Sequence, residues 1–193
     1  MSGEARLVLA SASPRRLELL RQLGLEPDAV ASAELDETPE PKESPRRLAL
    51  RLAQAKAARV ACSNPDAYVL AADTVVAVGM RVLPKAETAQ EVRSCLELLS
   101  GRNHRVWTGL AVIAPGGRVG SRLVETRVQF KRLDGREIDT YAASGEGQGK
   151  AGGYGVQGRA GAFVISLIGS YTSVVGLPLY ETFNLLRGLG YPS

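Results

Sequence analysis

The sequence predicts an α/β protein with a mixed sheet and flanking helices, because buried strand-like runs alternate with helical segments and a hairpin interrupts them. Short apolar runs typical of buried strands occur at Arg6–Ala10 and Tyr68–Ala72. Two longer β-rich runs, 105–114 and 118–133, are joined by Pro115-Gly116-Gly117, which is typical of an antiparallel hairpin. Early parallel connections and a later antiparallel pair together favour a mixed sheet.

The predicted helices carry recognisable start and stop signals. Two of them begin with serine followed by proline, at Ser13-Pro14 and Ser44-Pro45, where serine can cap the helix and proline fits its first turn. The first is expected to end at Leu23 before Gly24, and the second near Ala61. A capping box, Thr88-x-x-Glu91, opens a third helix. Further helices are predicted over 135–143 and from 178 to 188–190.

The remaining segments are shorter or irregular. Residues 26–43 are acidic and contain proline, which indicates a loop or irregular strand, and 75–82 are expected to form a small hairpin that turns at Gly79. Residues 144–161 hold eight glycines, and 162–168 read as a strand. Neither a repeat nor a linker divides the chain, so we expect one domain over residues 1–193.

Bulk composition narrows the class of protein. A length of 193 residues with 45% apolar content suits one domain with a sizeable core. No stretch approaches the roughly 20 apolar residues of a membrane span. The N-terminus lacks a secretory apolar region, so the cytoplasm is the expected compartment. Cys62 and Cys95 are isolated, which indicates small buried thiols in a reducing compartment rather than a disulfide.

Charge and histidine content limit the possible partners. A net charge of +4 without a basic run permits nucleic-acid binding but does not require it. The single histidine, His104, nearly excludes multi-histidine metal sites, and we interpret it as structural. Any metal should therefore be a hard cation held by oxygen, Mg²⁺ or Mn²⁺.

Two cations lie on apolar arcs of predicted helices. At about 100° per residue, Arg16 falls within the arc of Leu20 and Leu23, and Lys56 falls within a stripe of leucine and alanine. A charge facing a core is costly unless an anion receives it. Snorkelling or an internal ion pair is the alternative. With Asp73 at the end of an apolar run, the pattern predicts a buried polyanion site beside a metal or base.

The first helix start has the features of a phosphate site. Ser11-Ala-Ser-Pro-Arg15-Arg16 follows a strand and opens a helix, where free N–H groups and the helix dipole attract anions. The two arginines add bidentate donors. An ordinary cap with two surface arginines is the competing interpretation, and the Walker A pattern is missing.

Acidic and amide side chains supply further candidates. Asp73-Thr74 follows an apolar strand, the usual place for a ligand in α/β proteins, and an aspartate there can hold a metal or accept a proton from water. The acidic loop residues, Glu37 among them, could add a metal ligand or only solvate the loop. Lys85 could pair with a phosphate. The amide of Gln157 complements the N3–H and O4 edge of uracil or thymine.

Four segments together resemble the Maf family of nucleoside triphosphate pyrophosphatases. They are Leu9-Ala-Ser-Ala-Ser-Pro-Arg-Arg16, Ala71-Ala-Asp-Thr-Val-Val76, Gly149-Lys-Ala-Gly-Gly-Tyr-Gly-Val-Gln-Gly158 and Gly169-Ser-Tyr-Thr-Ser-Val-Val-Gly-Leu-Pro178. Their order and spacing match the family over nearly the whole chain.

The resemblance implies a fold related to the inosine triphosphate pyrophosphatases, with a cleft between two lobes. It implies hydrolysis of a nucleoside triphosphate to monophosphate and pyrophosphate with a divalent cation, in a homodimer that needs neither membrane nor nucleic acid. Asp73 matches the proton acceptor, and Arg16, Thr74 and Gln157 match positions that track substrate choice. The other matched positions are Ser11, Arg15, Glu37, Lys56 and Lys85.

The Asp-Thr and Gln-Gly forms resemble the subgroup that acts on dTTP and UTP in nucleotide-pool house-cleaning, and modified uridine triphosphates would fit the same pocket. We therefore expect phosphate contacts from Ser11, Arg15 and Arg16, catalytic roles for Asp73, Lys56 and Lys85, and a metal on Glu37 and Asp73. One departure is Pro84-Lys85-Ala86, where the family usually has Gly-Lys-Pro. The alternatives are a 7-methyl-GTP pyrophosphatase and a non-catalytic nucleotide- or nucleic-acid-binding regulator of cell division.

Overall fold

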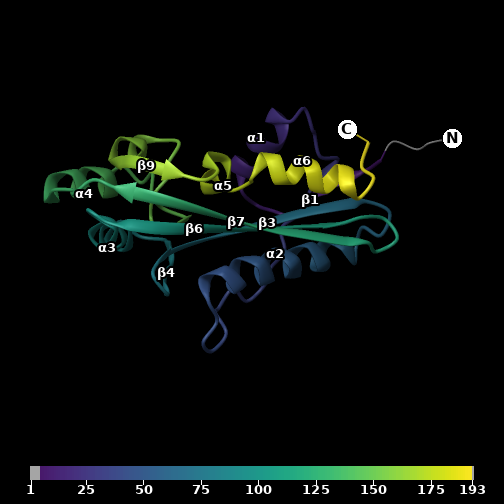
Figure 1. Cartoon of the computed structure of the whole chain (residues 1–193), viewed down its shortest axis with the longest axis horizontal. Helices are drawn as coiled ribbons and strands as arrows, with labels where there is room; N and C mark the ends of the chain where they lie inside the picture. Colours follow the sequence, from purple (N-terminus) through teal and green to yellow (C-terminus); the bar gives the residue numbers. More distant parts are fainter. Residues whose placement is uncertain (1–4, 193) are drawn as a thin grey trace.

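The computed structural model describes residues 5–192 and contains one twisted mixed sheet with helices on both faces (Figure 1). The strand order is β2-β1-β3-β6-β7-β9, and β4 pairs with part of β3. The strands are β1 (Leu7–Leu9), β2 (Ala29–Val30), β3 (Tyr68–Val78), β4 (Arg81–Leu83), β6 (Asn103–Ile113), β7 (Val119–Phe130) and β9 (Val164–Ile168). A second, two-stranded sheet joins β5 (Lys85–Ala86) to β8 (Lys150–Ala151). The predicted mixed α/β class is confirmed.

The helices cover the sheet in two groups. In Figure 1, α2 lies on one face and α1 and α6 lie on the other, while α3 and α4 gather at the far end. Their bounds are α1 (Pro14–Gln22), α2 (Pro45–Ala61), α3 (Ala89–Leu99), α4 (Gly135–Ala143), α5 (Tyr171–Val175) and α6 (Leu179–Gly188), with a 3₁₀ turn η1 (Arg159–Phe163). The predicted helices agree with these bounds within about two residues, whereas the short α5 was not predicted.

The buried side chains form separate clusters that define two lobes. At the end near β1, α1 and α6 pack on one face of the sheet and α2 packs on the other. At the opposite end, α3 and α4 pack with the glycine-rich segment around Phe130. Strands β3 and β6 contribute to both ends, so one continuous sheet supports the two lobes.

Strand β3 departs from the sequence prediction. The expectation that a strand ends at Ala72 is wrong, because β3 continues through Asp73 to Val78 before Gly79, at φ +60°, turns the chain into β4. The apolar run resumes at Val75 after Thr74, and β6 pairs with β3 along this whole stretch. Asp73 therefore lies in the middle of a strand rather than at its end.

The other edge of β3 explains how Asp73 is still reachable. The parallel partner β1 pairs with β3 only as far as Leu70, and β4 pairs with it only from Val76. The edge of β3 between these two partners has no neighbouring strand, and it carries Asp73 and Thr74. The carboxyl end of β1, and not that of β3, thus creates the opening expected in an α/β sheet.

Helix α2 approaches the sheet closely next to this opening. Gly109 in β6 lies directly opposite Asp73 in the strand register. A Cβ at Gly109 would lie 2.2 Å from the carbonyl oxygen of Ala49 in α2, so only glycine allows this contact. The close packing brings α2, which also carries Lys56, against the strand that carries Asp73.

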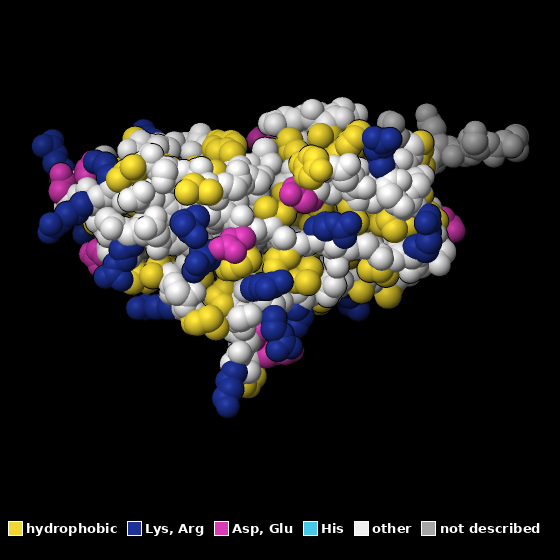
Figure 2. Space-filling view, viewed as in Figure 1, with side chains coloured by type: hydrophobic (Ala, Val, Ile, Leu, Met, Phe, Trp, Pro, Cys, Tyr) yellow, Lys and Arg dark blue, Asp and Glu magenta, His cyan; other side chains and the backbone are white. Residues whose placement is uncertain are grey.

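The remaining sequence predictions concern membrane spans, basic surface and the two cysteines. No helix within residues 5–192 is both long enough and apolar enough to cross a bilayer. Lys and Arg side chains are scattered over the face shown in Figure 2 and form no single stripe there. Cys95 is buried as expected, but the prediction is wrong for Cys62, which is exposed because it follows the last turn of α2.

Candidate active site

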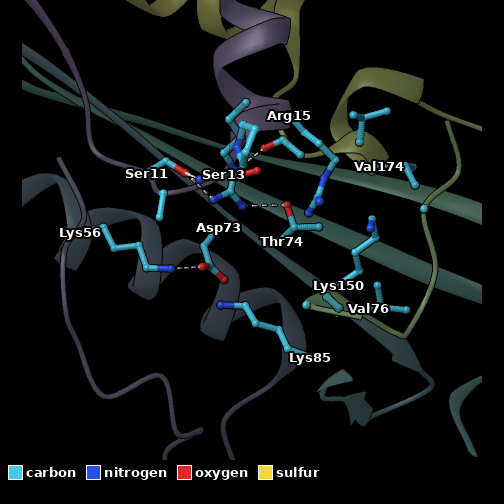
Figure 3. A pocket seen from close by; sticks show the side chains of 18 of the residues that line it. Ser11, Ser13, Arg15, Lys56, Asp73, Thr74, Val76, Lys85, Lys150 and Val174 are labelled. Atoms are coloured by element: carbon cyan, nitrogen blue, oxygen red, sulfur yellow. Dashed lines mark hydrogen bonds and ion pairs between the residues drawn. The ribbon is translucent and has the colours of Figure 1, made fainter. Parts of the chain in front are cut away.

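A cavity of about 350 Å³ opens along the unpaired edge of β3, between the start of α1 and the glycine-rich segment (Figure 3). Every candidate site residue named from the sequence lines it. These are Ser11, Arg15, Arg16, Glu37, Lys56, Asp73, Thr74, Lys85 and Gln157. Side chains separated by up to about three quarters of the chain therefore meet in one place.

Lys56 lies between the two carboxylates of the cavity. Its Nζ bonds Oδ1 of Asp73 and lies 2.6 Å from Oε1 of Glu37. Lys56 and Asp73 are only 7% and 4% exposed. The buried ammonium group of Lys56 thus has the ion-pair partners that a buried charge requires. These ion pairs lie inside the cavity rather than away from it. Within residues 5–192 these bonds of Asp73 use Oδ1 alone, and no side-chain hydrogen bond or ion pair uses its Oδ2.

Glu37 links the acidic loop to both lysines. Its Oε2 accepts a 2.8 Å bond from Nζ of Lys85 while its Oε1 faces Lys56. Partial burial opposes ionisation of this carboxyl, but the hydrogen bonds from Lys56 and Lys85 outweigh it and lower its pKa to about 2. Glu37 is therefore a carboxylate throughout the physiological range, and Lys85 reaches the cavity despite the proline before it.

Arg16 lines the cavity and makes three hydrogen bonds there. Its Nε donates to the carbonyl of Gly176 at 2.9 Å, and its two terminal nitrogens donate to Oγ of Ser11 at 3.2 Å and Oγ1 of Thr74 at 3.3 Å. Gly176 ends α5 at φ +141°, a conformation that favours glycine. All three acceptors are neutral, and no carboxylate within residues 5–192 forms an ion pair with this guanidinium.

Thr74 is fixed from behind by a chain of hydroxyl groups. Its Oγ1 lies 3.2 Å from Oγ1 of Thr108, which in turn donates to the carbonyl of Ser173 at 2.8 Å. Thr108 and Ser173 are fully buried. These bonds tie β3, β6 and α5 together beneath the cavity and hold Thr74 in one orientation.

The start of α1 brings the cation Arg15 to the cavity. The side chain of Ser13 makes no capping bond, contrary to expectation, and the backbone N–H of Ser13 donates to Oγ of Ser11 at 3.2 Å. Within residues 5–192 no carboxylate forms an ion pair with Arg15, whose side chain points into the cavity in Figure 3. This end of the helix is therefore available to an anion.

Gln157 lies on the opposite wall, in the glycine-rich segment. It is exposed and lines the cavity next to Gly155. Tyr154 in the same segment also lines the cavity, and its hydroxyl lies 2.8 Å from Nε2 of His104. His104 itself is 2% exposed, and burial lowers its pKa to about 4, which agrees with a structural role.

Sequence reasoning missed some residues of the cavity. Lys150 lines it but was noted only as part of a glycine-rich motif, and Val174 and Val175 contribute an apolar patch from the unpredicted α5. A lysine within a glycine-rich run was the available signal for Lys150. Nothing in the local pattern around Val174 and Val175 distinguishes them from core residues.

The charge balance of the cavity is positive. The described lining residues include five cations, Arg15, Arg16, Lys56, Lys85 and Lys150, against the carboxylates Glu37 and Asp73, which leaves a net charge of +3. Such an excess in a partly enclosed site attracts an anion with several negative charges.

The donors also suit a hard divalent cation that shares its ligands with a substrate. Within residues 5–192 no group of three or more acidic, cysteine or histidine side chains is arranged for a metal. Carboxylate oxygens of Glu37 and Asp73 nevertheless lie around one position, which the ammonium group of Lys56 occupies. Mg²⁺ is commonly bound by one or two carboxylates with substrate phosphates and water, so two carboxylates are sufficient.

The chain matches the Maf-like protein family over residues 6–189. It belongs to that family. A dTTP/UTP pyrophosphatase from Caulobacter vibrioides is 65% identical over 191 residues, which cover 99% of each chain. A dTTP/UTP pyrophosphatase from Maricaulis maris is 65% identical over 187 residues, covering 97% of this chain and 89% of the relative. The expected family membership is confirmed.

Among solved structures there is a more distant likeness. A nucleoside-triphosphatase, a dITP/XTP pyrophosphatase from Mycobacterium abscessus, aligns with a TM-score of 0.43 and 20% identity. The alignment covers 66% of this chain and 75% of that chain.

Proposed function

We propose that this Maf-like protein hydrolyses dTTP and UTP to the monophosphate and pyrophosphate. The observation that carries the proposal is the meeting of Asp73 with five cations in one cavity, in a chain 65% identical to proteins named for this activity. Modified uridine triphosphates that keep the N3–H and O4 edge belong to the same substrate class. Removal of surplus or non-standard nucleotides is the corresponding role.

The cations account for binding of the triphosphate. Arg15 and Arg16 receive phosphate oxygens at the start of α1, where the helix dipole also favours an anion, and Lys85 adds a half-exposed charge. Ser11 orients Arg16 through the 3.2 Å bond to its guanidinium. Binding and orientation of the phosphates supply much of the acceleration of a phosphoryl transfer.

Asp73 accounts for the chemical step. Lys56 holds one oxygen of its carboxylate, and the other is available to accept a proton from a water molecule. That water attacks the α-phosphorus, the bond to the bridging oxygen breaks, and pyrophosphate leaves without a covalent enzyme intermediate. Glu37 and Asp73 would hold the divalent cation, which neutralises charge on the phosphate oxygens.

The uracil or thymine base is assigned to the wall that carries Gln157. Its amide offers the donor and acceptor that pair with the N3–H and O4 edge. Thr74, rather than the glutamine typical of the 7-methyl-GTP subgroup, argues against that alternative. The apolar Val174 and Val175 can contact the base, and a single methyl group there changes discrimination only modestly.

A panel of nucleoside triphosphates with product identification tests the activity. We expect UTP and dTTP to be turned over at similar rates, with UMP or dTMP and pyrophosphate as products, and GTP to be turned over far more slowly. Chelation of divalent cations should abolish turnover. Comparable rates for GTP and UTP would contradict the base assignment, and binding without turnover would favour the regulator.

Asp73→Asn tests the proton acceptor. The variant should fold, because the amide can still accept from Lys56 and Glu37 still neutralises that lysine. We expect kcat for UTP to fall at least about 100-fold, the low end of a general base's contribution. The control is Asp139→Asn, which removes an exposed carboxylate on α4 that pairs with Arg93 of α3. Near-normal turnover by Asp73→Asn would remove Asp73 from the mechanism.

Family membership also suggests a homodimer that acts in the cytoplasm. Light scattering on purified protein measures the molecular mass in solution and tests the oligomeric state directly.

A further inference from the structure

Lys150 is a cation of the cavity to which the mechanism above gives no role. It lies in β8 of the two-stranded sheet, on the wall formed by the glycine-rich segment. Arg15 reaches into the same cavity from the start of α1, on the opposite wall (Figure 3). The two positive side chains therefore approach each other across the cleft from different lobes.

Arg15 and Lys150 differ from the other lysines of the cavity in their ion pairs. Within residues 5–192 no carboxylate forms an ion pair with Arg15 or Lys150, whereas Lys56 and Lys85 share Glu37. Partial burial lowers the pKa of Lys150 and the nearby charge of Arg15 lowers it further, while the carboxylate of Glu146 opposes these two effects. Like charges held together without a counter-ion are costly, unless a ligand supplies the negative charge.

The surrounding backbone fixes the position of Lys150. Strand β8 pairs with β5, and the adjacent Gly149 N–H donates to the carbonyl of Ala86 at 2.8 Å. The stem of Lys150 passes over Gly155, where a Cβ would lie 3.1 Å from its Cε. The missing side chain at Gly155 thus leaves the channel along which Lys150 enters the cavity.

We propose that Lys150 and Arg15 bind the phosphate chain of the substrate from opposite walls, so that the nucleotide joins the two lobes. This inference rests on the proposed function, because it takes the nucleoside triphosphate as the ligand. Phosphate oxygens offer several acceptors on one group, so an ammonium and a guanidinium can bind the same chain from two directions. The bound anion also removes the repulsion between the two cations.

A purely structural role for Lys150 is the competing explanation. Its Nζ donates to the backbone carbonyl of Glu146, four residues earlier, and that bond alone could stabilise the glycine-rich segment. A structural role predicts a loss of thermal stability with unchanged affinity for phosphate. A phosphate-binding role predicts the reverse.

The experiment compares Lys150→Met with wild type by calorimetric titration of inorganic tripolyphosphate in Mg²⁺, alongside kcat and KM for UTP. Methionine keeps the unbranched apolar stem that passes over Gly155 and removes the ammonium group, with its charge and its bond to the carbonyl of Glu146. We expect affinity for tripolyphosphate to fall about 10- to 100-fold, the effect of one charge-assisted hydrogen bond, and KM for UTP to rise by a similar factor. The melting temperature should stay near the wild-type value.

Two further variants complete the test. Lys131→Met removes the same charge from a lysine that pairs with Glu137 outside the cavity, and its affinity for tripolyphosphate should stay within about twofold of wild type. Lys150→Arg keeps the charge and should retain most of the affinity that Lys150→Met loses. Equal affinity of wild type and Lys150→Met for tripolyphosphate, or failure of wild type to bind it, would overturn the proposal.

The same data separate this inference from the proposed function. Suppose that wild type binds tripolyphosphate and Lys150→Met binds it weakly, but UTP is not hydrolysed. Then the phosphate clamp, meaning binding of the phosphate chain by Lys150 and Arg15 from opposite walls, is supported and the assigned reaction is wrong. If UTP is hydrolysed normally by Lys150→Met with an unchanged KM, the reaction stands and the clamp fails.

Discussion

Helices α1 and α2 begin with the same five residues, Ser-Pro-Arg-Arg-Leu, at 13–17 and 44–48, yet only one of these starts lies in the cavity. At α2 the serine behaves as a cap, since Oγ of Ser44 accepts from the Arg47 N–H at 3.3 Å. Arg46 and Arg47 are both exposed. This start is an ordinary helix terminus with two surface cations.

At α1 the same residues are used differently. Ser13 makes no capping bond, and Arg15 and Arg16 are partly buried and line the cavity. The difference lies in what precedes each start. Strand β1 ends next to the open edge of β3, so α1 starts there. The acidic residues 31–44 precede α2 instead, and the start of that helix faces the solvent. A motif therefore acquires its chemistry from the strand that positions it, and the two starts form a matched pair for experiment.

Among substitutions at the two helix starts, the largest effect is expected at the second arginine of α1. Arg16→Gln should lower kcat/KM for UTP about 100-fold or more, because an unbalanced guanidinium is lost from the cavity together with its bond to Thr74. Arg47→Gln should stay within about twofold of wild type. Steady-state kinetics measure both, and a thermal melt checks that each variant folds. Equal losses in the two variants would mean that the cavity does not distinguish the two helix starts.

The first arginine gives an intermediate effect. Arg15→Gln should raise KM for UTP about 10-fold with a smaller change in kcat, as expected when one charged contact to the phosphates is lost. Arg46→Gln, its counterpart on α2, should leave KM unchanged. A KM for Arg15→Gln equal to that of Arg46→Gln would place Arg15 among the solvated surface cations.

The smallest effect concerns the serines and runs in the opposite direction. Ser44→Ala should lower the free energy of unfolding by about 1 kcal/mol, since it removes a cap, and so lower the melting temperature by roughly 2–4 °C. Ser13→Ala should change stability less, because its side chain caps nothing. Thermal or urea unfolding decides the order, and a larger loss from Ser13→Ala would contradict the cap assignment.

Local signals explain why much of the fold was predictable. The predicted capping box closes, with Thr88 accepting from the backbone N–H of Glu91, and the structure adds a second one at Asp134 and Glu137 that was not predicted. Gly79 turns the β3–β4 hairpin at positive φ, and Pro115-Gly116-Gly117 joins β6 to β7. Each of these features depends on a few neighbouring residues, which a sequence displays directly.

Features that depend on distant partners were not predictable in the same way. The end of β3 was misplaced because its extent is set by pairing with β6, about thirty residues away. Sequence reasoning identified Lys56 as an unusual buried charge, but its position between Glu37 and Asp73 follows only from the approach of α2 to the sheet at Gly109. Lys150 was overlooked because its cavity-facing position depends on the pairing of β8 with β5.

Hydrolysis of UTP in water enriched in ¹⁸O tests the central claim most directly, namely that Asp73 directs water to the α-phosphorus. If water attacks the α-phosphorus, mass spectrometry will find the label in UMP and none in pyrophosphate. Label in pyrophosphate, or release of orthophosphate, would show that a different bond is broken and would contradict the account.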